Sequence, residues 1–332
     1  MSQHFQVLIA DFLNDELEPE RRVLEGVADV AALGARSEDA LLGRIDRADA
    51  IILYHEVSLS RRSIERLKRC KLIVRGGVGV DNVDGPFART QGIPVANVPD
   101  YGSEEVADSA IALALSLARG LHYVNSRLRA GQGNWSYRQV VPLARLRGST
   151  FGVVGLGRIG TAVALRAKAL GMDVAFYDPY KPDGYDKALG IRRVETLAEL
   201  LDRSLIVSLH CPLTDETRHL IDAAAIARMR RGSYLVNTAR GGVVDVAALP
   251  EALASGHLGG AGIDVLEHEP PPQDHPLLVA WRDPNHPAHH RLILNPHVAF
   301  YSEAGLMDIR LKTAEACRRA LVGLPLRNVV ND

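Results

Sequence analysis

The sequence has few cysteines and no spacing that would put them to structural use. Cys70, Cys211 and Cys317 are the only three, and they stand far apart without a C-x-x-C pattern. An odd number of isolated cysteines argues against a disulfide framework and against a zinc site. This pattern is typical of a reducing compartment, so we expect a cytoplasmic protein without a bound metal.

Surplus charge and long hydrophobic runs are also missing. The formal net charge is −1, so the chain has neither a basic footprint for nucleic acid nor an acidic tail. The longest apolar stretch, Ala110 to Ala118, is interrupted by Ser116 and is shorter than the roughly 20 residues that cross a bilayer. The first residues show no charged segment followed by an apolar one, so no signal peptide is visible. We therefore expect no membrane partner and no direct nucleic-acid partner.

The length of 332 residues exceeds the roughly 250–300 residues at which a single core stops growing, which predicts two domains. Short apolar runs with strand character alternate with helical patterns along most of the chain, and this alternation predicts an α/β protein with parallel sheets covered on both faces. The expected strands lie at residues 7–10, 50–54, 72–75, 93–97, 151–154, 174–177, 205–209, 234–237, 261–265 and 292–295, and the clearer helices at 61–69, 161–170, 222–230 and 246–255.

Two further helices bear on the organisation of the domains. A long one is expected from about Ser103 to Gly131, and its Ala/Leu-rich stretch is apolar around more than one face. Such a helix is buried by more than its own domain, either in an oligomer interface or between the domains of a monomer. The last helix, residues 302–322, has no strand partner nearby in the sequence. Its return to the first domain would make that domain discontinuous.

One segment is compositionally unusual. Residues 270–291 are rich in proline and histidine and are expected to form a surface loop. His286, His289 and His290 could suggest a metal site. Without a helical or strand frame to hold them, we interpret them as solvated side chains.

The most informative pattern is a glycine-rich turn between a strand and a helix. Gly155, Gly157 and Gly160 follow the strand at 151–154, and Asp178 ends the next strand about twenty residues later. In a dinucleotide site the first glycine permits the tight turn, the second lets the backbone approach a pyrophosphate, and the third lets helix and strand pack closely. Asp178 would accept hydrogen bonds from a ribose diol and would repel a 2′-phosphate, which favours NAD over NADP. The nearby Lys181 leaves NADP open.

Three polar side chains follow later strands of the same predicted sheet. Arg240, Glu269 and His297 each come just after a strand, and ligands of parallel sheets bind beyond the carboxyl ends of the strands. A histidine can exchange a proton with an alcohol or a ketone near neutral pH. A carboxylate can fix the tautomer of that histidine, and an arginine can bind a substrate carboxylate with two hydrogen bonds. Singly each residue is weak evidence, but together they indicate hydride-transfer chemistry.

With these residues the chain resembles the D-isomer-specific 2-hydroxyacid dehydrogenases over nearly its whole length. The motifs that carry the resemblance are residues 154–160 (VGLGRIG), 236–245 (VNTARGGVVD), 264–270 (DVLEHEP) and 295–299 (NPHVA). The resemblance implies that Arg240 binds substrate, that His297 is the acid/base and that Glu269 is its partner. Glu269 is preferred to Glu267 because the acid of the pair stands directly before proline in this family.

The resemblance also implies a cofactor site and a domain arrangement. An NAD domain at residues 102–298 would be inserted into a discontinuous substrate domain formed by residues 1–101 and 299–332. The implied NAD contacts are Val106, Gly155, Gly157, Arg158, Ile159, Gly160, Asp178, Cys211, Pro212, Thr217, Thr238 and Asp264. Residues 75–81 would offer backbone N–H groups to the substrate carboxylate, including those of Gly76 and Gly77.

Within the family, the sequence is similar to the C-terminal-binding-protein branch, whose animal members act as NADH-sensing corepressors. In that branch an arginine at the place of Arg75 reaches the substrate. Phe300 stands where the branch has tryptophan, which bears on substrate choice. Tyr54 and His55 are expected to shape the pocket with these residues. We expect a homodimeric NAD-dependent dehydrogenase of a small 2-hydroxy acid. An NADH-responsive corepressor and an enzyme for another acid-bearing alcohol are the alternatives.

Overall fold

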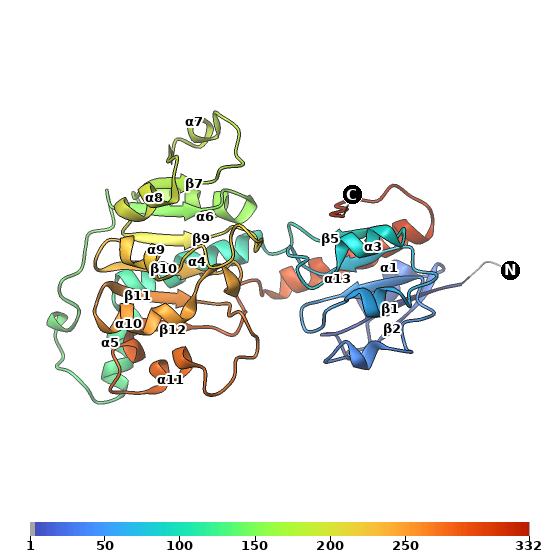
Figure 1. Ribbon diagram of the computed structural model, residues 1–332, viewed down its shortest axis with the longest axis horizontal. Helices are drawn as coiled ribbons and strands as arrows, with labels where there is room; N and C mark the ends of the chain where they lie inside the picture. Colours follow the sequence, from blue (N-terminus) through green and yellow to red (C-terminus); the bar gives the residue numbers. More distant parts are fainter. Residues whose placement is uncertain (1–3, 332) are drawn as a thin grey trace. The chain divides into compact units, whose positions relative to one another are not determined.

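The computed structural model describes residues 4–331, which form two compact units (Figure 1). Unit 1 contains the residues up to Gly102 together with those from Ser302 onward, and unit 2 runs from Ser103 to Tyr301. The sheet of each unit is built from parallel strand pairs. The prediction of an α/β protein with parallel sheets is confirmed. In the part of the chain that is described, no helix combines the length and apolar character that a membrane crossing requires.

The sheet of unit 1 has the strand order β2-β1-β3-β4-β5. Because β1 is followed in sequence by β2 on one side and pairs with β3 on the other, the strand order reverses next to β1, and loops on either side of it diverge. Strand β2 was not among the predicted strands. The strands are β1 (Phe5–Ile9), β2 (Ala28–Ala32), β3 (Ala50–Leu53), β4 (Ile73–Arg75) and β5 (Val95–Asn97).

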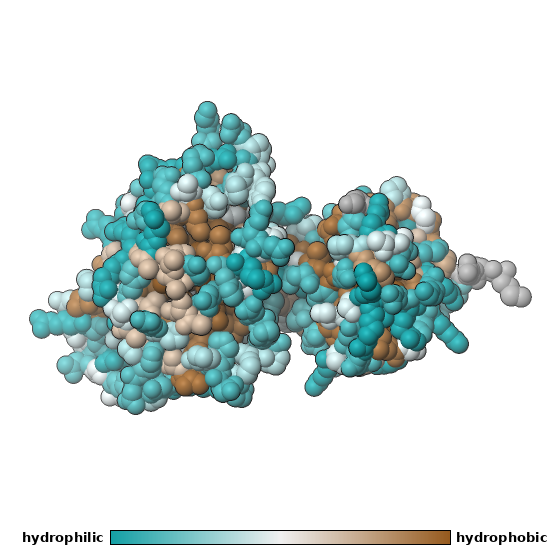
Figure 2. Space-filling view, viewed as in Figure 1, coloured by the Kyte–Doolittle hydropathy of each residue, from teal (hydrophilic) through white to brown (hydrophobic). Residues whose placement is uncertain are grey.

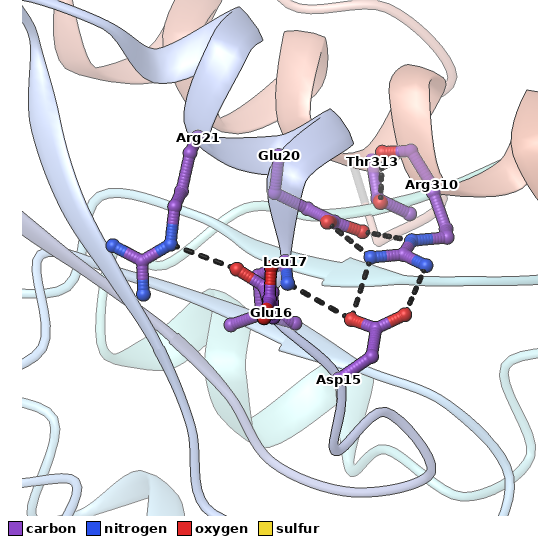
Figure 3. A network of polar contacts seen from close by, with 7 residues as sticks. All are labelled: Asp15, Glu16, Leu17, Glu20, Arg21, Arg310 and Thr313. Atoms are coloured by element: carbon purple, nitrogen blue, oxygen red, sulfur yellow. Dashed lines mark hydrogen bonds and ion pairs between the residues drawn. The ribbon is translucent and has the colours of Figure 1, made fainter.

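Both faces of this sheet are covered by helices. Side chains alternate between the faces along each strand, so Val7 and Ile9 face one cluster while Leu8 faces the other. The first cluster includes residues of α13, and α13 packs against α1 and β3. Arg310 of α13 reaches Glu20 of α1 through two hydrogen bonds of 2.6 and 2.7 Å (Figure 3). The helices are α1 (Glu18–Leu24), α2 (Arg61–Ile64), α3 (Gly85–Thr90) and α13 (Glu303–Leu321).

The sheet of unit 2 has the order β12-β11-β10-β9-β6-β7-β8. The chain enters at β6, adds β7 on one side and later returns to place β9 on the other, so the order reverses between β6 and β9. A crevice at such a point is where ligands bind in open α/β sheets. The strands are β6 (Thr150–Val154), β7 (Asp173–Tyr177), β8 (Arg192–Arg193), β9 (Ile206–Leu209), β10 (Ser233–Asn237), β11 (Leu258–Ile263) and β12 (Leu292–Leu294).

Helices cover the two faces of this sheet with separate hydrophobic clusters. One cluster joins strand residues such as Phe151 and Val153 to α4 and α6, and the other joins Val154 and its neighbours to the remaining helices. On the face of unit 2 shown in Figure 2, hydrophobic residues gather toward the centre and hydrophilic residues surround them. The helices are α4 (Ser103–Ala118), α5 (Leu121–Arg129), α6 (Arg158–Ala169), α7 (Tyr185–Leu189), α8 (Leu197–Arg203), α9 (Ala223–Arg228), α10 (Leu249–Ala254), α11 (Pro276–Arg282) and α12 (Ala288–Arg291).

Two predictions about local structure were wrong, and the helix expected at residues 61–69 ends early, at Ile64. The helix expected from Ser103 to Gly131 is two helices, because Gly120 adopts a left-handed conformation with φ +64° between α4 and α5. The proline- and histidine-rich segment is not a plain surface loop, since α11 and α12 form within it. Its His290 is buried and hydrogen-bonds to Ser126 at 3.0 Å, because α12 packs against α5.

Candidate functional site

The glycine turn after β6 is shaped by its neighbours. Gly155 has φ +85°, and a Cβ there would lie 2.7 Å from the backbone N of Cys211, so both the conformation and the space require glycine. At Gly160 a Cβ would lie 2.0 Å from the carbonyl oxygen of Gly155, which explains the close packing of α6 on the turn. The turn therefore lies against the end of β9, at the point where the strand order reverses.

Gly157 has a different reason to be glycine. Its backbone (φ −74°, ψ −160°) is open to any residue, and a Cβ would meet no atom within 4 Å. It immediately precedes α6, a helix of 12 residues whose first N–H groups and dipole attract anions. Arg158 and Ile159 form the first turn of that helix. The missing side chain leaves room for a pyrophosphate in front of the helix, as the sequence predicts.

Asp178, directly after β7, is tied to the glycine turn. One carboxylate oxygen accepts the N–H of Leu156 at 2.8 Å, and the other accepts the N–H of Tyr180 at 3.0 Å. Each oxygen retains a lone pair for a further donor such as a ribose hydroxyl. The ammonium of Lys181 lies over the ring of Tyr185, 5.1 Å from its centroid.

The loop after β9 lies on the other side of the point where the strand order reverses. Cys211 is half-buried, and burial raises the pKa of its thiol to about 11, so the thiol stays protonated at neutral pH. The hydroxyl of Thr217 donates to the carbonyl of Pro212 at 2.6 Å and accepts the N–H of Thr214 at 2.8 Å. Thr217 thus holds the loop in shape. Tyr180 hydrogen-bonds across to Glu216 of this loop, a contact that the sequence did not suggest.

Thr238 and Asp264 follow the adjacent strands β10 and β11. The hydroxyl oxygen of Thr238 is buried and has no hydrogen-bond partner among residues 4–331, as expected for a group that a bound ligand would satisfy. The carboxylate of Asp264 accepts the N–H groups of Val298 and Ala299 at 3.0 and 3.1 Å. Burial raises the pKa of Asp264, and these two hydrogen bonds oppose the shift.

Val106 is buried near the start of α4, which packs against α6 and β10. One turn further along this helix, the hydroxyl of Ser109 donates to the carbonyl of Ala299 at 3.2 Å, next to the His297 turn. Taken together, the open space before α6, the orphaned hydroxyl of Thr238 and the carboxylate of Asp178 fit a dinucleotide such as NAD.

The candidate catalytic residues follow three neighbouring strands. Arg240 comes after β10, Glu269 after β11 and His297 after β12. Nδ1 of His297 lies 2.6 Å from Oε2 of Glu269, and the other oxygen of Glu269 accepts the N–H of Leu266 at 2.7 Å. The structure therefore brings the predicted pair into direct contact and fixes the carboxylate from its own loop.

Arg240 is presented by a turn packed against the loop of Glu269. The side chain of Asn237 shapes this turn by donating to the carbonyl of Arg240 at 2.9 Å and accepting the N–H of Ala239 at 3.0 Å. A Cβ on Gly241 would lie 1.9 Å from the carbonyl carbon of Leu266, so the two loops touch backbone to backbone. Asn237 was not among the predicted residues, although its place at the end of a strand is a usable signal.

His297 adopts an unusual backbone conformation. Its φ is +54°, in the left-handed region that few residues other than glycine enter. The carbonyl of Asp264 accepts its N–H at 2.8 Å, and the Asp264 carboxylate holds the next two N–H groups. Phe300 lies edge-on to the imidazole, with ring centroids 6.0 Å apart. Asp264 thus holds the His297 turn in place.

Residues of unit 1 form a second group at the ends of β3 and β4. Tyr54 is buried, His55 is exposed, and the guanidinium of Arg75 donates to the carbonyl of Gly76 at 3.1 Å. The N–H groups of Gly76 and Gly77 already donate to Leu53 and Arg75 at 2.7 and 2.9 Å. These two groups are therefore not the anion donors that we expected in this loop.

The histidines of the 270–291 segment make hydrogen bonds within the fold. Within residues 4–331, no cluster of histidine, cysteine, aspartate and glutamate side chains has an arrangement suited to a metal ion. The expectation that these histidines are solvated is wrong for His290, which is buried. His289 is held by the carbonyl of Trp281 at 2.8 Å. Both histidines have structural partners instead.

Comparison with known proteins agrees with this geometry. Two curated relatives are D-3-phosphoglycerate dehydrogenase of Methanocaldococcus jannaschii, 36% identical over 98% of this chain and 59% of the relative, and C-terminal-binding protein 1 of Caenorhabditis elegans, 37% identical over 92% of this chain and 42% of the relative. The chain thus spans about three fifths and two fifths of their lengths.

A solved structure is similar over almost its whole length. D-lactate dehydrogenase from Aquifex aeolicus, complexed with NAD and lactic acid, is 29% identical with a TM-score of 0.85, and the match covers 96% of each chain. Residues 111–299 match the family model described as D-isomer specific 2-hydroxyacid dehydrogenase, NAD binding domain. The chain belongs to the D-isomer-specific 2-hydroxyacid dehydrogenase family.

Proposed function

We propose that this protein is an NAD-dependent oxidoreductase that interconverts a 2-keto acid and a D-2-hydroxy acid. The observation that carries the proposal is the 2.6 Å contact between His297 and Glu269 at the strand ends of unit 2, beside the loop of Arg240. Family membership adds the class of reaction. The same assignment makes unit 2 the NAD domain, proposed at residues 102–298, and unit 1 the substrate domain, proposed at 1–101 and 299–332.

In this proposal His297 exchanges the hydroxyl proton of the substrate. With Nδ1 held by Glu269, Nε2 is the ring atom that gives or takes the proton, and the carboxylate stabilises the imidazolium. The guanidinium of Arg240 binds the substrate carboxylate and orients the reacting carbon. The nicotinamide, when bound, supplies or accepts the hydride.

Unit 1 contributes substrate-binding groups in this proposal. Arg75 offers a second cation, and Tyr54 and His55 are further proposed substrate contacts from unit 1. Phe300, beside His297, is the substrate contact proposed from unit 2. The glycine-rich loop after β4 still offers N–H groups to a carboxylate, but they are those of Val78 and Gly79. Among the described residues, no hydrogen bond has either of these two N–H groups as its donor. They replace Gly76 and Gly77 in our assignment.

NAD is favoured over NADP because Asp178 places a carboxylate beside the glycine turn, where a 2′-phosphate would meet like charge. The contacts proposed for NAD are those predicted from the sequence.

The test is a panel of 2-keto acids with NADH, followed by absorbance at the nicotinamide band. We expect turnover of at least one acid, a lower rate with NADPH, and a loss of about 10²-fold or more in His297→Ala, the range of general acid–base assistance. NADH binding, measured by fluorescence, should persist in that variant. Absence of NADH oxidation with every acid would overturn the enzyme assignment.

A second candidate is an NADH-responsive binding protein with little turnover. The observation in its favour is the 37% identity to C-terminal-binding protein 1. The same panel separates the two, because this candidate requires NADH binding without significant oxidation.

We also propose that the protein is a homodimer. The segment after α5 presents large aromatic side chains to solvent, with Trp135 92% and Tyr137 75% exposed, and exposed aromatic residues of this size favour an interface. Light scattering on the purified protein should give twice the mass of one chain. The Trp135→Ser variant should give a lower measured mass, because its dimer is weaker. A monomeric mass for the unaltered chain would exclude the dimer.

A further inference from the structure

The chain leaves β1 through a strained turn centred on Phe12. Phe12 has φ +68°, and the N–H of Leu13 donates to the carbonyl of Asp11 at 2.8 Å. These features define a γ-turn of the rare positive-φ kind. A bulky residue keeps such a conformation only where its surroundings impose it, and strained residues of this type concentrate at functional sites.

The groups that hold Phe12 in this conformation are polar and buried. Asp11 is fully buried, and its carboxylate accepts the N–H groups of Tyr54, Glu56 and Val57 at 2.6, 2.7 and 3.1 Å. Burial raises the pKa of Asp11, and these three hydrogen bonds oppose the shift. From the other side, the amide of Asn82 donates to the carbonyls of Tyr54 and Val57 at 2.8 and 2.7 Å. The γ-turn and the loop of residues 54–57 are therefore fixed to one another.

The turn places the Phe12 ring over two candidate substrate residues. Its centroid lies 5.1 Å from that of Tyr54 and 5.0 Å from that of His55, and the side chain is only half-buried. On the Tyr54 ring lies Gly76, where a Cβ would come within 2.7 Å of a ring carbon. Tyr54 and Gly76 are buried, so Phe12 is the partly exposed member of this stack, which ends at the proposed carboxylate loop.

We propose that Phe12 determines substrate specificity by forming an apolar wall for the substituent of the 2-keto acid. The inference rests on the proposed function and names the substrate class as 2-keto acids with a branched aliphatic or aromatic side chain. Such a side chain would be removed from water when it packs against Phe12, and this burial would strengthen substrate binding. A terminal phosphate or carboxylate would lose hydration there without an assured partner.

The experiment compares the unaltered protein with Phe12→Asn. Asparagine tolerates a positive φ, so the variant keeps the turn and removes only the ring. Steady-state kcat/KM is measured with NADH and three acids: pyruvate, 2-ketoisocaproate and phenylpyruvate. We expect a loss of about 10-fold or more with the two larger acids and less than about threefold with pyruvate, the size of effect that hydrophobic groups give in pockets.

Two further variants keep the test decisive. Phe12→Tyr retains the ring and should retain the preference for the larger acids. Phe12→Gly adopts the turn without strain and serves if the asparagine variant does not fold. Equal losses with all three acids would overturn the inference, as would an unaltered protein that prefers pyruvate.

Failure of the proposed function would look different. In that case the unaltered protein oxidises NADH with none of the acids. The specificity inference is then read from calorimetric Kd values for the same acids in the presence of NADH. The inference is supported if Phe12→Asn raises the Kd of phenylpyruvate about 10-fold more than the Kd of pyruvate. It is overturned if neither acid binds or if both Kd values rise equally.

Discussion

Two glutamates in the loop after β11 enter different networks, although they stand two residues apart. Glu269 contacts His297, whereas Glu267 pairs with Arg218 at 2.9 Å and lies 3.4 Å from Nε2 of His219. The motif already favours Glu269, because Glu269 stands directly before Pro270 and Glu267 does not. The geometry favours Glu269 as the residue that orients the imidazole.

We predict that Glu269→Gln lowers kcat by roughly 10²–10⁴-fold, because glutamine cannot stabilise an imidazolium by charge. Glu267→Gln is the matched control, since it removes an acid from the same loop, and its kcat should remain within about threefold. Steady-state rates with the best acid of the panel provide the measurement. Equal losses in the two variants would contradict the assignment of Glu269.

Residue-level roles could be predicted only where a strand end or a motif marked them. Arg240, Glu269 and His297 were marked in this way. Asp11 and Phe12 also follow a predicted strand, but no motif marked them or Asn82. Their hydrogen bonds and ring contacts join β1, β3 and the loop after β4. A single sequence carries no trace of which distant N–H groups a carboxylate will accept.

Among the elements, α13 joins the end of the chain to its beginning. Arg310 on this helix contacts both Glu20 and Asp15 (Figure 3), with the closest distances at 2.6 Å. The Glu20 side chain is fully buried, whereas that of Asp15 is 53% exposed. The Arg310–Glu20 pair is therefore the buried part of this network, whereas the contact between Arg310 and Asp15 is screened by solvent.

Arg310→Leu should lower the free energy of unfolding by about 3–5 kcal/mol, because it leaves the Glu20 charge buried without a partner. Asp15→Ala should cost about 1 kcal/mol or less. Urea denaturation measures both. The double variant Arg310→Leu/Glu20→Leu should recover most of the loss; a midpoint as low as that of Arg310→Leu alone would show that the buried charge is not the cause.

Element boundaries could be predicted where the apolar pattern was strong. The central strands of both sheets lie within a few residues of their predicted positions. β2 was missed because Ala28–Ala32 contains three alanines and an aspartate, which give little strand signal. The break at Gly120 was missed because one glycine inside a helical pattern is compatible with continuation. The helices within 270–291 depend on packing against α5 and α10.

At the scale of the whole molecule, each unit carries its own core, and unit 2 contains the buried His290 and the half-buried His122 and His210. Burial lowers the pKa of His210 to about 3 and also lowers the pKa values of His122 and His290. In the unfolded chain these side chains take up protons near their ordinary pKa of 6.5. The unfolded state therefore binds more protons than the folded state below that pH.

It follows that unit 2 is most stable above about pH 6.5 and loses stability as the pH falls toward about 3. Thermal unfolding between pH 8 and pH 5 should show a falling Tm. In His210→Gln the difference in Tm between these two pH values should shrink, whereas in His268→Gln, which changes an exposed histidine, it should not. A His210→Gln variant with the same pH dependence as the unaltered protein would exclude this histidine as the source.

The left-handed backbone of His297 has a consequence for evolution and for engineering. The left-handed conformation of His297, with φ +54°, lowers the stability of the folded protein by about 1–3 kcal/mol. His297 is also the residue that we propose as the acid/base. Replacement by glycine or asparagine would release that cost. Selection for heat resistance alone would therefore favour the loss of His297, and with it the loss of the acid/base that we propose.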